Sequence, residues 1–311
     1  MLTVDVIIPT YKPGKRLLHL LDLLSRQSIL PEHIILMNTE EKYLRELYDE
    51  NDLIIKFPQL KIIHLDKKQF DHGQTRNDGV TLSDTQAFLL MTQDALPKDT
   101  ELIANLVREL EKPGTAVAYA RQLPEENCDP AEAYARSFNY PDIPDRKTQE
   151  DIGRLGIKTY FCSNVCAMYR RDIFDCLGGF THHTVFNEDM IYAGTAAKAG
   201  YAIAYVSSAA VIHSHNYTCM QQFHRNFDLG VSQADHPEIF EGLKSETEGK
   251  RMVVQTIHFL QNNKKTYLIP HYIIMCGWKY AGFKLGRNYR SLPHWFILKC
   301  TMNRTYWKCG I

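Results

Sequence analysis

The sequence contains no apolar run long enough to cross a bilayer. The most apolar stretch, residues 267–278, is shorter than the roughly 20 residues that a spanning helix needs, and it contains Pro270 and His271. A leader pattern is also missing, because residues 3–8 already have the apolar character of a strand. We therefore expect no signal peptide and a protein that stays in the cytoplasm.

No Cys-x-x-Cys pair occurs among the eight cysteines, so the usual signature of redox and zinc-binding modules is absent. Cys162 and Cys166 lie close together, but in an apolar, strand-like segment. Buried, reduced thiols are the ordinary explanation for such a pair, and a metal or redox site is the alternative.

Acidic residues are missing from the last part of the chain. The formal net charge is zero, with 36 basic and 36 acidic residues, yet residues 250–311 hold 11 Lys or Arg and no Asp or Glu. All three tryptophans lie in the same segment. Basic and aromatic side chains without acids suit an anionic membrane surface, and a packed helical subdomain with a solvated basic face is the alternative. No recognised nucleic-acid motif accompanies the charge, so we expect no nucleic-acid partner.

The first half of the chain alternates short apolar runs with helical patterns, which indicates βαβ units and a mostly parallel sheet. Apolar residues at helical spacing predict amphipathic helices over residues 17–24 and 102–110. The predicted strands are residues 4–9, 33–37, 60–65, 87–91 and 116–120.

The second half is less regular. Residues 124–158 are rich in Pro, Asp and Glu and are interpreted as a surface excursion. A strand-like segment follows at 161–169, then a helix from Asn187 closed by Gly200, and after residue 216 the chain is predicted to be helical. Two further strands are predicted at 202–206 and 209–212.

Glycine-rich phosphate signatures are absent, since neither G-x-G-x-x-G nor G-x-x-x-x-G-K occurs. The first strand instead ends in Pro9, Thr10 and Tyr11 and turns into a helix. Such a turn offers backbone N–H groups to a nucleotide or anion. The first strand of any α/β protein is the simpler reading.

The segment 66–77, after the third strand, is too polar for a core and opens a helix near His72. Arg76 is suited to bidentate contact with phosphate oxygens. A solvated loop with a helix N-cap is the alternative.

Candidate metal ligands follow two strands. Asp94 comes after the fourth strand, where a carboxylate can hold Mg²⁺ or Mn²⁺ beside phosphates; the alternative is a cap of the turn before Pro97. His213 and His215 end the last strand on one face, a spacing that allows metal or phosphate contact.

Glu188 and Asp189 are predicted to begin a helix. Two acids at this position interact favourably with the helix dipole, which is a sufficient structural explanation. The alternative is a general base.

In this order and spacing, the fragments resemble glycosyltransferase family 2, the inverting enzymes of GT-A fold that use nucleotide-activated sugars. The resemblance covers about residues 3–230. It rests on residues 7–11 (IIPTY), Thr92-Gln93-Asp94 where the family has Asp-x-Asp, residues 164–171 running to 178–180, Glu188-Asp189 and His213.

Within the family, residues 70–77 and 223–230, the latter including Arg225, look most like bacterial rhamnosyltransferases of cell-wall or surface polysaccharides. That likeness implies dTDP-L-rhamnose as donor, a lipid-linked or saccharide acceptor, and a peripheral place at the inner face of the cell membrane. It also implies a GT-A domain over residues 1–225, followed by a helical, basic region over 226–311 that contacts the acceptor or the membrane.

The resemblance also implies roles for single residues. Asp189 becomes the catalytic base beside Glu188, and Asp94 becomes a ligand of Mg²⁺ or Mn²⁺, with His213 as a possible second ligand. Contacts to the nucleotide or donor are implied for Pro9, Thr10, Tyr11, Asn38, Arg76, Asn77 and Gln93, and further site positions for His72, His215 and Arg225.

Two positions depart from the family. Asn38 replaces the usual Asp after the second strand, and Thr92 replaces the first Asp of the metal motif. A catalytically degenerate nucleotide-sugar-binding module and a transferase that uses a UDP-hexose are therefore alternatives. A sugar-phosphate nucleotidyltransferase fits less well, because residues 10–14 lack a glycine-rich loop bearing Arg or Lys.

Overall fold

The structure is a computed structural model that describes residues 1–243 and 245–308. The chain divides into two compact units, which we call the sheet unit and the helical unit. The sheet unit comprises Met1–Leu123, Tyr140–His182 and Glu188–His213; the helical unit comprises Pro124–Asn139, His183–Asn187 and Ser214–Ile311.

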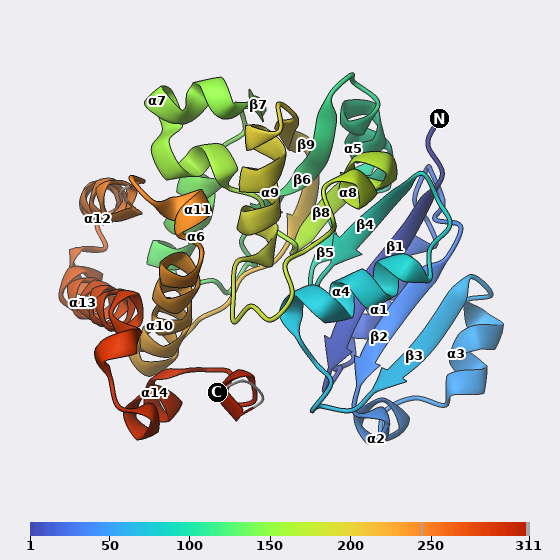
Figure 1. Cartoon of the computed structure of the whole chain (residues 1–311), viewed down its shortest axis with the longest axis horizontal. Helices are drawn as coiled ribbons and strands as arrows, with labels where there is room; N and C mark the ends of the chain where they lie inside the picture. The colour runs from blue at the N-terminus through green and yellow to red at the C-terminus, as the bar shows by residue number, and fades with distance from the viewer. Residues whose placement is uncertain (244, 309–311) are drawn as a thin grey trace. The chain divides into compact units, whose positions relative to one another are not determined.

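The sheet unit is built on a nine-stranded sheet with the order β3-β2-β1-β4-β8-β6-β9-β5, and β7 pairs with β9 (Figure 1). Strands β1, β2, β3, β4, β6 and β9 run in one direction, and β5, β7 and β8 run in the other. The sheet is therefore mixed and mostly parallel, as predicted. The strands are β1 (Val4–Tyr11), β2 (Ile34–Thr39), β3 (Leu60–Leu65), β4 (Ala87–Met91), β5 (Leu96–Pro97), β6 (Thr115–Leu123), β7 (Asp145–Lys147), β8 (Cys166–Arg170) and β9 (Ala202–Ile212).

Helices cover both faces of this sheet (Figure 1). On one face the apolar stripes of α1 and α5 belong to one buried cluster together with alternate β1 residues such as Val6 and Ile8. On the other face α4 approaches closely at Gly79, where a Cβ would lie 2.6 Å from Cγ2 of Ile7. The helices of this unit are α1 (Arg16–Leu24), α2 (Glu41–Arg45), α3 (Glu50–Lys56), α4 (His72–Thr81), α5 (Leu102–Leu110), α7 (Ile152–Leu155), α8 (Arg171–Cys176) and α9 (Glu188–Lys198).

Buried aromatic rings fill the space beside β4 and β8. Tyr169 stacks on Phe88 with ring centroids 5.3 Å apart and meets Phe180 and Tyr192 edge-on, each at 5.2 Å. Such ring pairs add stabilisation beyond their buried area. This aromatic cluster places the tyrosine hydroxyl of β8 near the start of α9.

The helical unit packs α10 against α13 at glycines. A Cβ on Gly286 would lie 2.0 Å from the carbonyl oxygen of Phe227, so the backbones of the two helices approach closely. Tyr134 of α6 stacks on Phe259 of α12 at 4.7 Å. The helices are α6 (Pro130–Asn139), α10 (Cys219–Asp235), α11 (Pro237–Phe240), α12 (Ser245–Asn262), α13 (Ile269–Arg287) and α14 (His294–Cys300). No helix in the described part of the chain combines the length and apolar character that crossing a membrane requires.

Three local predictions differ from the structure. The strands predicted at 202–206 and 209–212 are one strand, β9, whose register against β6 shifts between Val206 and Ala210. The strand predicted over 161–169 is shorter and begins later, at Cys166–Arg170. The interpretation of 124–158 as a surface excursion missed α6, whose Asp129 side chain accepts from the N–H of Ala131 and whose first residue is proline.

The boundary predicted after residue 225 falls inside α10, whereas the compact units divide before Ser214 and assign α6 to the helical unit.

Candidate active site

The carboxyl ends of β1, β2 and β3 are joined by a chain of buried polar contacts. The Thr10 hydroxyl donates to Asn38 Oδ1 at 3.0 Å, and Asn38 Nδ2 lies 3.0 Å from His64 Nδ1. Asn38 is fully buried. Both ends of its amide are therefore used inside the protein, and its predicted nucleotide contact stays a prediction.

Tyr11 is held in place by Gln93, the residue before Asp94. Gln93 Oε1 accepts from the Tyr11 N–H at 3.1 Å and Gln93 Nε2 donates to the Tyr11 carbonyl at 3.0 Å. The Tyr11 ring meets Tyr43 edge-on at 5.6 Å, and Lys67 Nζ lies 3.2 Å from the Tyr11 hydroxyl. This hydrogen bond from Lys67 lowers the pKa of Tyr11. The two rings and the ammonium group provide aromatic and cationic contacts at the strand ends.

The polar segment 66–77 forms the start of α4. Asp71 is its N-cap and accepts from the N–H groups of Gly73 and Gln74. The helix N-cap given above as the alternative for this segment is therefore present. Gly73 is required here, because a Cβ would lie 2.0 Å from the carbonyl oxygen of Thr181. Asn77 makes two hydrogen bonds to the backbone of Phe180. These contacts fix the first turns of α4 against the segment before α9.

Arg76 of α4 forms an ion pair with Glu188 of α9. Its Nη1 lies 3.2 Å from Glu188 Oε1 and donates to the His72 carbonyl at 2.7 Å. The side chains of Arg76 and Glu188 are only 9% and 7% exposed, so this is a buried ion pair. The structure thus brings Arg76 to an acidic residue of the site, whereas its predicted phosphate contact stays a prediction.

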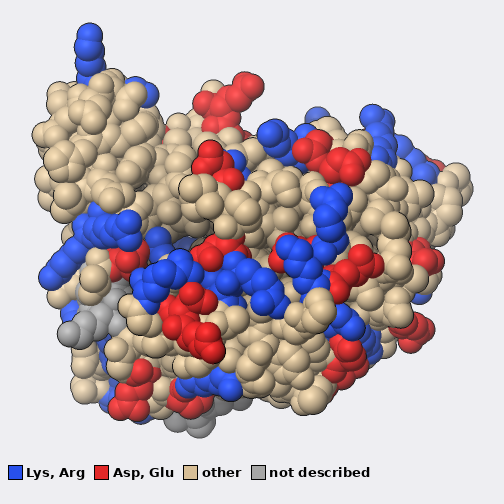
Figure 2. All heavy atoms as spheres, turned by 90° about the horizontal axis from the view of Figure 1, so that it is seen from above, with Lys and Arg blue, Asp and Glu red and all other residues tan. Residues whose placement is uncertain are grey.

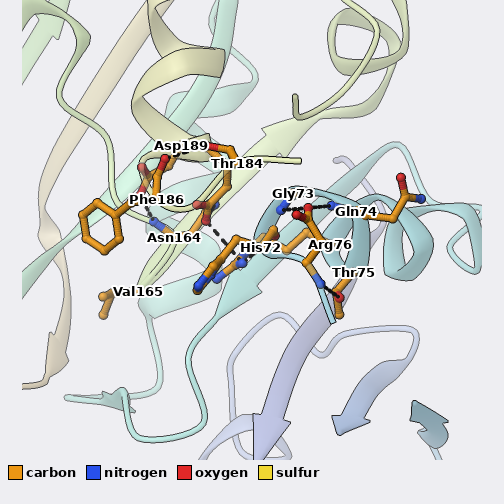
Figure 3. Close-up of polar contacts among 12 residues, drawn as sticks. His72, Gly73, Gln74, Thr75, Arg76, Asn164, Val165, Thr184, Phe186 and Asp189 are labelled. Carbon is orange, nitrogen blue, oxygen red and sulfur yellow. Dashed lines mark hydrogen bonds and ion pairs between the residues drawn. The ribbon is translucent and has the colours of Figure 1, made fainter. Parts of the chain in front are cut away.

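Asn164 contacts both acids at the start of α9. Its backbone N–H donates to Asp189 Oδ2 at 3.0 Å (Figure 3). Its side-chain Nδ2 donates to Glu188 Oε1 at 3.0 Å. The Tyr169 hydroxyl donates to Asn164 Oδ1 at 2.6 Å. These contacts fix both carboxylates, while Asp189 remains partly exposed.

The two adjacent acids have different electrostatic environments. Burial, and then the charge of Glu188, raise the pKa of Asp189 to about 7. Burial alone would also raise the pKa of Glu188, but Arg76, His72 and Asn164 outweigh it and lower that pKa. These environments favour the negative charge on Glu188 and the proton on Asp189.

Asp94 and His213 face one another after β4 and β9, with His213 Nε2 3.7 Å from Asp94 Oδ1. His213 Nδ1 lies 3.1 Å from Gln122 Oε1, and Gln122 Nε2 donates to Tyr140 and Ser163. The amide orientation assigns the proton to Nδ1, which directs the Nε2 lone pair toward Asp94. A carboxylate and an imidazole supported in this way fit a divalent cation.

The strand end that carries Asp94 lies next to the segment that carries Asn164. The Thr92 N–H donates to the Val165 carbonyl at 3.1 Å. Because Asn164 in turn holds Asp189, the backbone links the predicted metal ligand and the predicted base at one edge of the sheet.

Two predicted residues belong to the helical unit. The Arg225 guanidinium lies over the Phe186 ring at 4.7 Å, and the His215 ring lies 5.0 Å from that of Tyr217. Both groups have aromatic neighbours within their own unit.

Comparisons with known proteins identify the family. The protein-family model described as "Glycosyl transferase family 2" matches residues 5–178. The chain belongs to glycosyl transferase family 2. It is thus a glycosyltransferase, and the sequence resemblance to this family is confirmed.

Two curated relatives are similar over almost their whole length. The O-antigen chain rhamnosyltransferase RfbN of Salmonella typhimurium is 38% identical over 309 residues, covering 98% of this chain and 96% of the relative. The O-antigen chain rhamnosyltransferase WbaN of Salmonella anatum is 35% identical over 312 residues, covering 99% and 96%.

A solved structure supports the fold. The mannosyltransferase PcManGT from Pyrobaculum calidifontis, in complex with GDP-Man and Mn²⁺, has a TM-score of 0.63 at 14% identity, covering 92% of this chain and 87% of that one. At this identity the likeness concerns the fold alone, and it confirms the GT-A class expected from the sequence.

Asn164 is one residue of the site that sequence reasoning missed as a functional candidate. It appears there only as the first residue of a matched segment, before an apolar strand. In the structure Asn164 is buried, and its side chain forms hydrogen bonds with Glu188 and Tyr169. A single polar residue directly before an apolar strand is the signal by which the sequence could have indicated it.

Proposed function

We propose that this glycosyltransferase moves L-rhamnose from dTDP-L-rhamnose to a hydroxyl of a lipid-linked or saccharide acceptor during surface polysaccharide synthesis. The observation that carries the proposal is the identity of 38% and 35%, over nearly full length, with two proteins named O-antigen chain rhamnosyltransferases. Residues 1–225 hold the donor and the reacting groups, and residues 226–311 serve the acceptor or the membrane.

In the proposed reaction, Asp189 accepts the proton of the acceptor hydroxyl while that oxygen forms a bond to the anomeric carbon. The bond between this carbon and the diphosphate breaks, its electron pair leaves with the diphosphate, and the configuration inverts. The partial exposure of Asp189 and its pKa of about 7 support this role. A base with such a pKa is effective near neutral pH.

Donor binding is assigned to the strand ends. The rings of Tyr11 and Tyr43 and the ammonium groups of Lys12 and Lys67 lie together there, with Lys12 Nζ 4.9 Å from the Tyr43 ring centroid. Aromatic faces accommodate a base and ammonium groups attract phosphates. The predicted contacts of Pro9 and Thr10 belong to the same edge.

Mg²⁺ or Mn²⁺ would be held by Asp94 and His213, whose arrangement with Gln122 supports a cation. When bound, such a cation neutralises charge on a diphosphate. Gln122 keeps the imidazole in the required tautomer, and Tyr140 and Ser163 keep the Gln122 amide oriented.

We also propose that the protein works peripherally on the cytoplasmic side of an anionic membrane. Figure 2 shows basic and acidic side chains intermixed over one face of the molecule. Within the sequence, residues 250–311 contain no acid. Exposed apolar residues lie in this segment, including Ile273, Ile274 and Trp278 of α13 with 51%, 56% and 39% exposure. Apolar side chains that enter the interface, next to cations that attract anionic lipid, suit such a surface.

Thermal shift with a panel of nucleotide sugars tests the donor. We expect dTDP-L-rhamnose to raise the melting temperature more than UDP-glucose or GDP-mannose at equal concentration, because a ligand stabilises the fold according to its affinity. A larger shift with UDP-glucose would assign the donor to the UDP-hexose class. Binding without transfer to a lipid extract of the source organism would favour the degenerate module.

A further inference from the structure

Glu188 and Asp189 are adjacent in sequence, yet their carboxylates have different contacts. Asn164 supplies one donor to each of them: its backbone N–H to Asp189 and its side-chain amide to Glu188, both at 3.0 Å. Arg76 forms an ion pair with Glu188, and the described chain shows none between Arg76 and Asp189. The surroundings are therefore asymmetric about the pair.

The Asn164 amide has one usable orientation. Its Oδ1 accepts from the hydroxyl of Tyr169, a residue fully buried among aromatic rings. A flipped amide would present its NH₂ group to a hydroxyl that can also act as an acceptor, but it would then present its oxygen to the Glu188 carboxylate. Two acceptors would face one another, so Tyr169 and Glu188 together hold the amide.

Arg76 is likewise fixed. Its Nη1 is shared between Glu188 and the carbonyl of His72, one turn earlier on the same helix. The side chain is 9% exposed, so little water competes for the ion pair. A buried carboxylate with both a guanidinium and an amide donor stays ionised.

We propose that Arg76 and Asn164 are positioning residues that hold Glu188 as a permanent negative charge beside Asp189, so that Asp189 alone takes the proton. This inference rests on the proposed function, in which Asp189 is the base. Glu188 then acts through Asp189 and exchanges no proton with the acceptor.

Among the described residues, few titratable or charged groups lie near Asp189 on each neighbouring element. Glu188 lies on its own helix, Arg76 and His72 lie on α4, and Cys162 and Tyr169 belong to the segment around β8. Burial raises the pKa of Cys162 to about 12 and raises that of Tyr169, so both are neutral between pH 5 and 9. His72 is the remaining side chain of a type that titrates in this range.

The test is the pH dependence of kcat/KM between pH 5 and 9, measured as release of dTDP from dTDP-L-rhamnose with water as acceptor. Wild type is compared with Glu188→Gln, with the double variant Arg76→Met/Glu188→Gln, and with Asp175→Asn as a matched control. Asp175 of α8 is an exposed acid paired with Arg171, so its variant makes the same charge change outside the site.

Glu188→Gln removes a negative charge that disfavours ionised Asp189. The positive charge of Arg76 remains, and it favours ionised Asp189. The acid limb is the part of the pH profile where kcat/KM falls toward low pH. We expect this limb to lie about one pH unit or more lower in Glu188→Gln than in wild type. In the double variant the limb should lie between those of wild type and Glu188→Gln, because the positive charge is also removed. The double variant also keeps the test usable if an unpaired Arg76 prevents the single variant from folding. Asp175→Asn should leave the limb unchanged.

Asn164→Ala removes the side-chain donor but keeps the backbone N–H to Asp189. We expect kcat to fall roughly 10-fold with an unchanged KM for the donor, because a poorly placed base affects the transition state alone. The wild-type limb should also persist in His72→Asn, which excludes that imidazole as its origin.

The outcomes separate the two levels of the proposal. A limb that stays at its wild-type pH in Glu188→Gln and in the double variant overturns the positioning role, even if Asp189→Asn is inactive. Full activity of Asp189→Asn instead overturns the base assignment of the proposed function. An inactive Glu188→Gln that binds donor at all pH values, beside an active Asp189→Asn, makes Glu188 the base.

Discussion

The first turn of α9 and the outer face of α13 depart from the usual burial pattern in opposite directions. In α9 the charged side chain of Glu188 is buried, and Arg76 and Asn164 satisfy it. In α13 apolar side chains such as Ile273 and Ile274 are more than half exposed. The buried charge in α9 is thus compensated by other residues of the chain. The exposed apolar side chains of α13 are of the kind that a partner outside the chain would cover.

The largest expected effect concerns the acids in the first turn of α9. Asp189→Asn should lower transfer by about 10³-fold, because the amide cannot accept the acceptor proton. Donor binding, measured by calorimetry with dTDP-L-rhamnose, should be unchanged. The substitution keeps the shape of the side chain, so a loss of donor binding would mean that the residue serves the donor.

The next effect separates the base from the predicted cation ligand. Asp94→Ala should reduce transfer by about 100-fold, and excess Mn²⁺ should restore little of it. In wild type a chelator should produce a similar loss that Mn²⁺ or Mg²⁺ reverses. Asp94→Ala with full activity in excess chelator would contradict the metal assignment. Asp84→Ala, an acid outside the site, is the control.

A smaller effect is expected on α13. Replacing Ile273 and Ile274 by Ser should weaken sedimentation with vesicles containing phosphatidylglycerol by about 10-fold, because less apolar surface enters the interface. Ile54 and Ile55 of α3 are also exposed, at 43% and 77%, and their double Ser variant is the matched control. Equal binding by both double variants would remove α13 from the membrane surface. A change from dimer to monomer in solution would instead indicate a second copy of the chain as the partner.

The smallest effect is on stability. The pKa of Asp189 is raised on folding, so its contribution to stability is greatest below its unfolded pKa and is lost as pH rises toward about 7. Asp189→Asn should therefore melt a few degrees above wild type at pH 8, and this gain should shrink at pH 5. A lower melting temperature for the variant at pH 8 would mean that the ionised carboxylate stabilises the fold.

Much of the sheet unit could be predicted because its signals are local. Each run predicted as a strand between residues 4 and 91 forms one, and the polar residues after these runs lie at the strand ends. Glu188 and Asp189 do begin a helix. These features follow from hydrophobic periodicity and from residue types at segment ends.

The missing parts depend on contacts between distant residues. The backbone N–H of Asn164 contacts Asp189 across 25 positions, and Arg76 reaches Glu188 across an even longer separation. No local pattern indicates which acid Arg76 will meet. The burial of Asn38 likewise follows from its contacts with Thr10 and His64 on neighbouring strands. Sequence spacing therefore located the acids but not the contacts that make their environments different.

The most direct test of the central claim is the pH profile of kcat/KM for the wild-type protein with dTDP-L-rhamnose. With one base of pKa about 7, the rate should rise about tenfold per pH unit below that pH and level off above it. A profile that is flat from pH 5 to 9 would contradict the account, because a carboxylate with an ordinary pKa would already be ionised throughout that range.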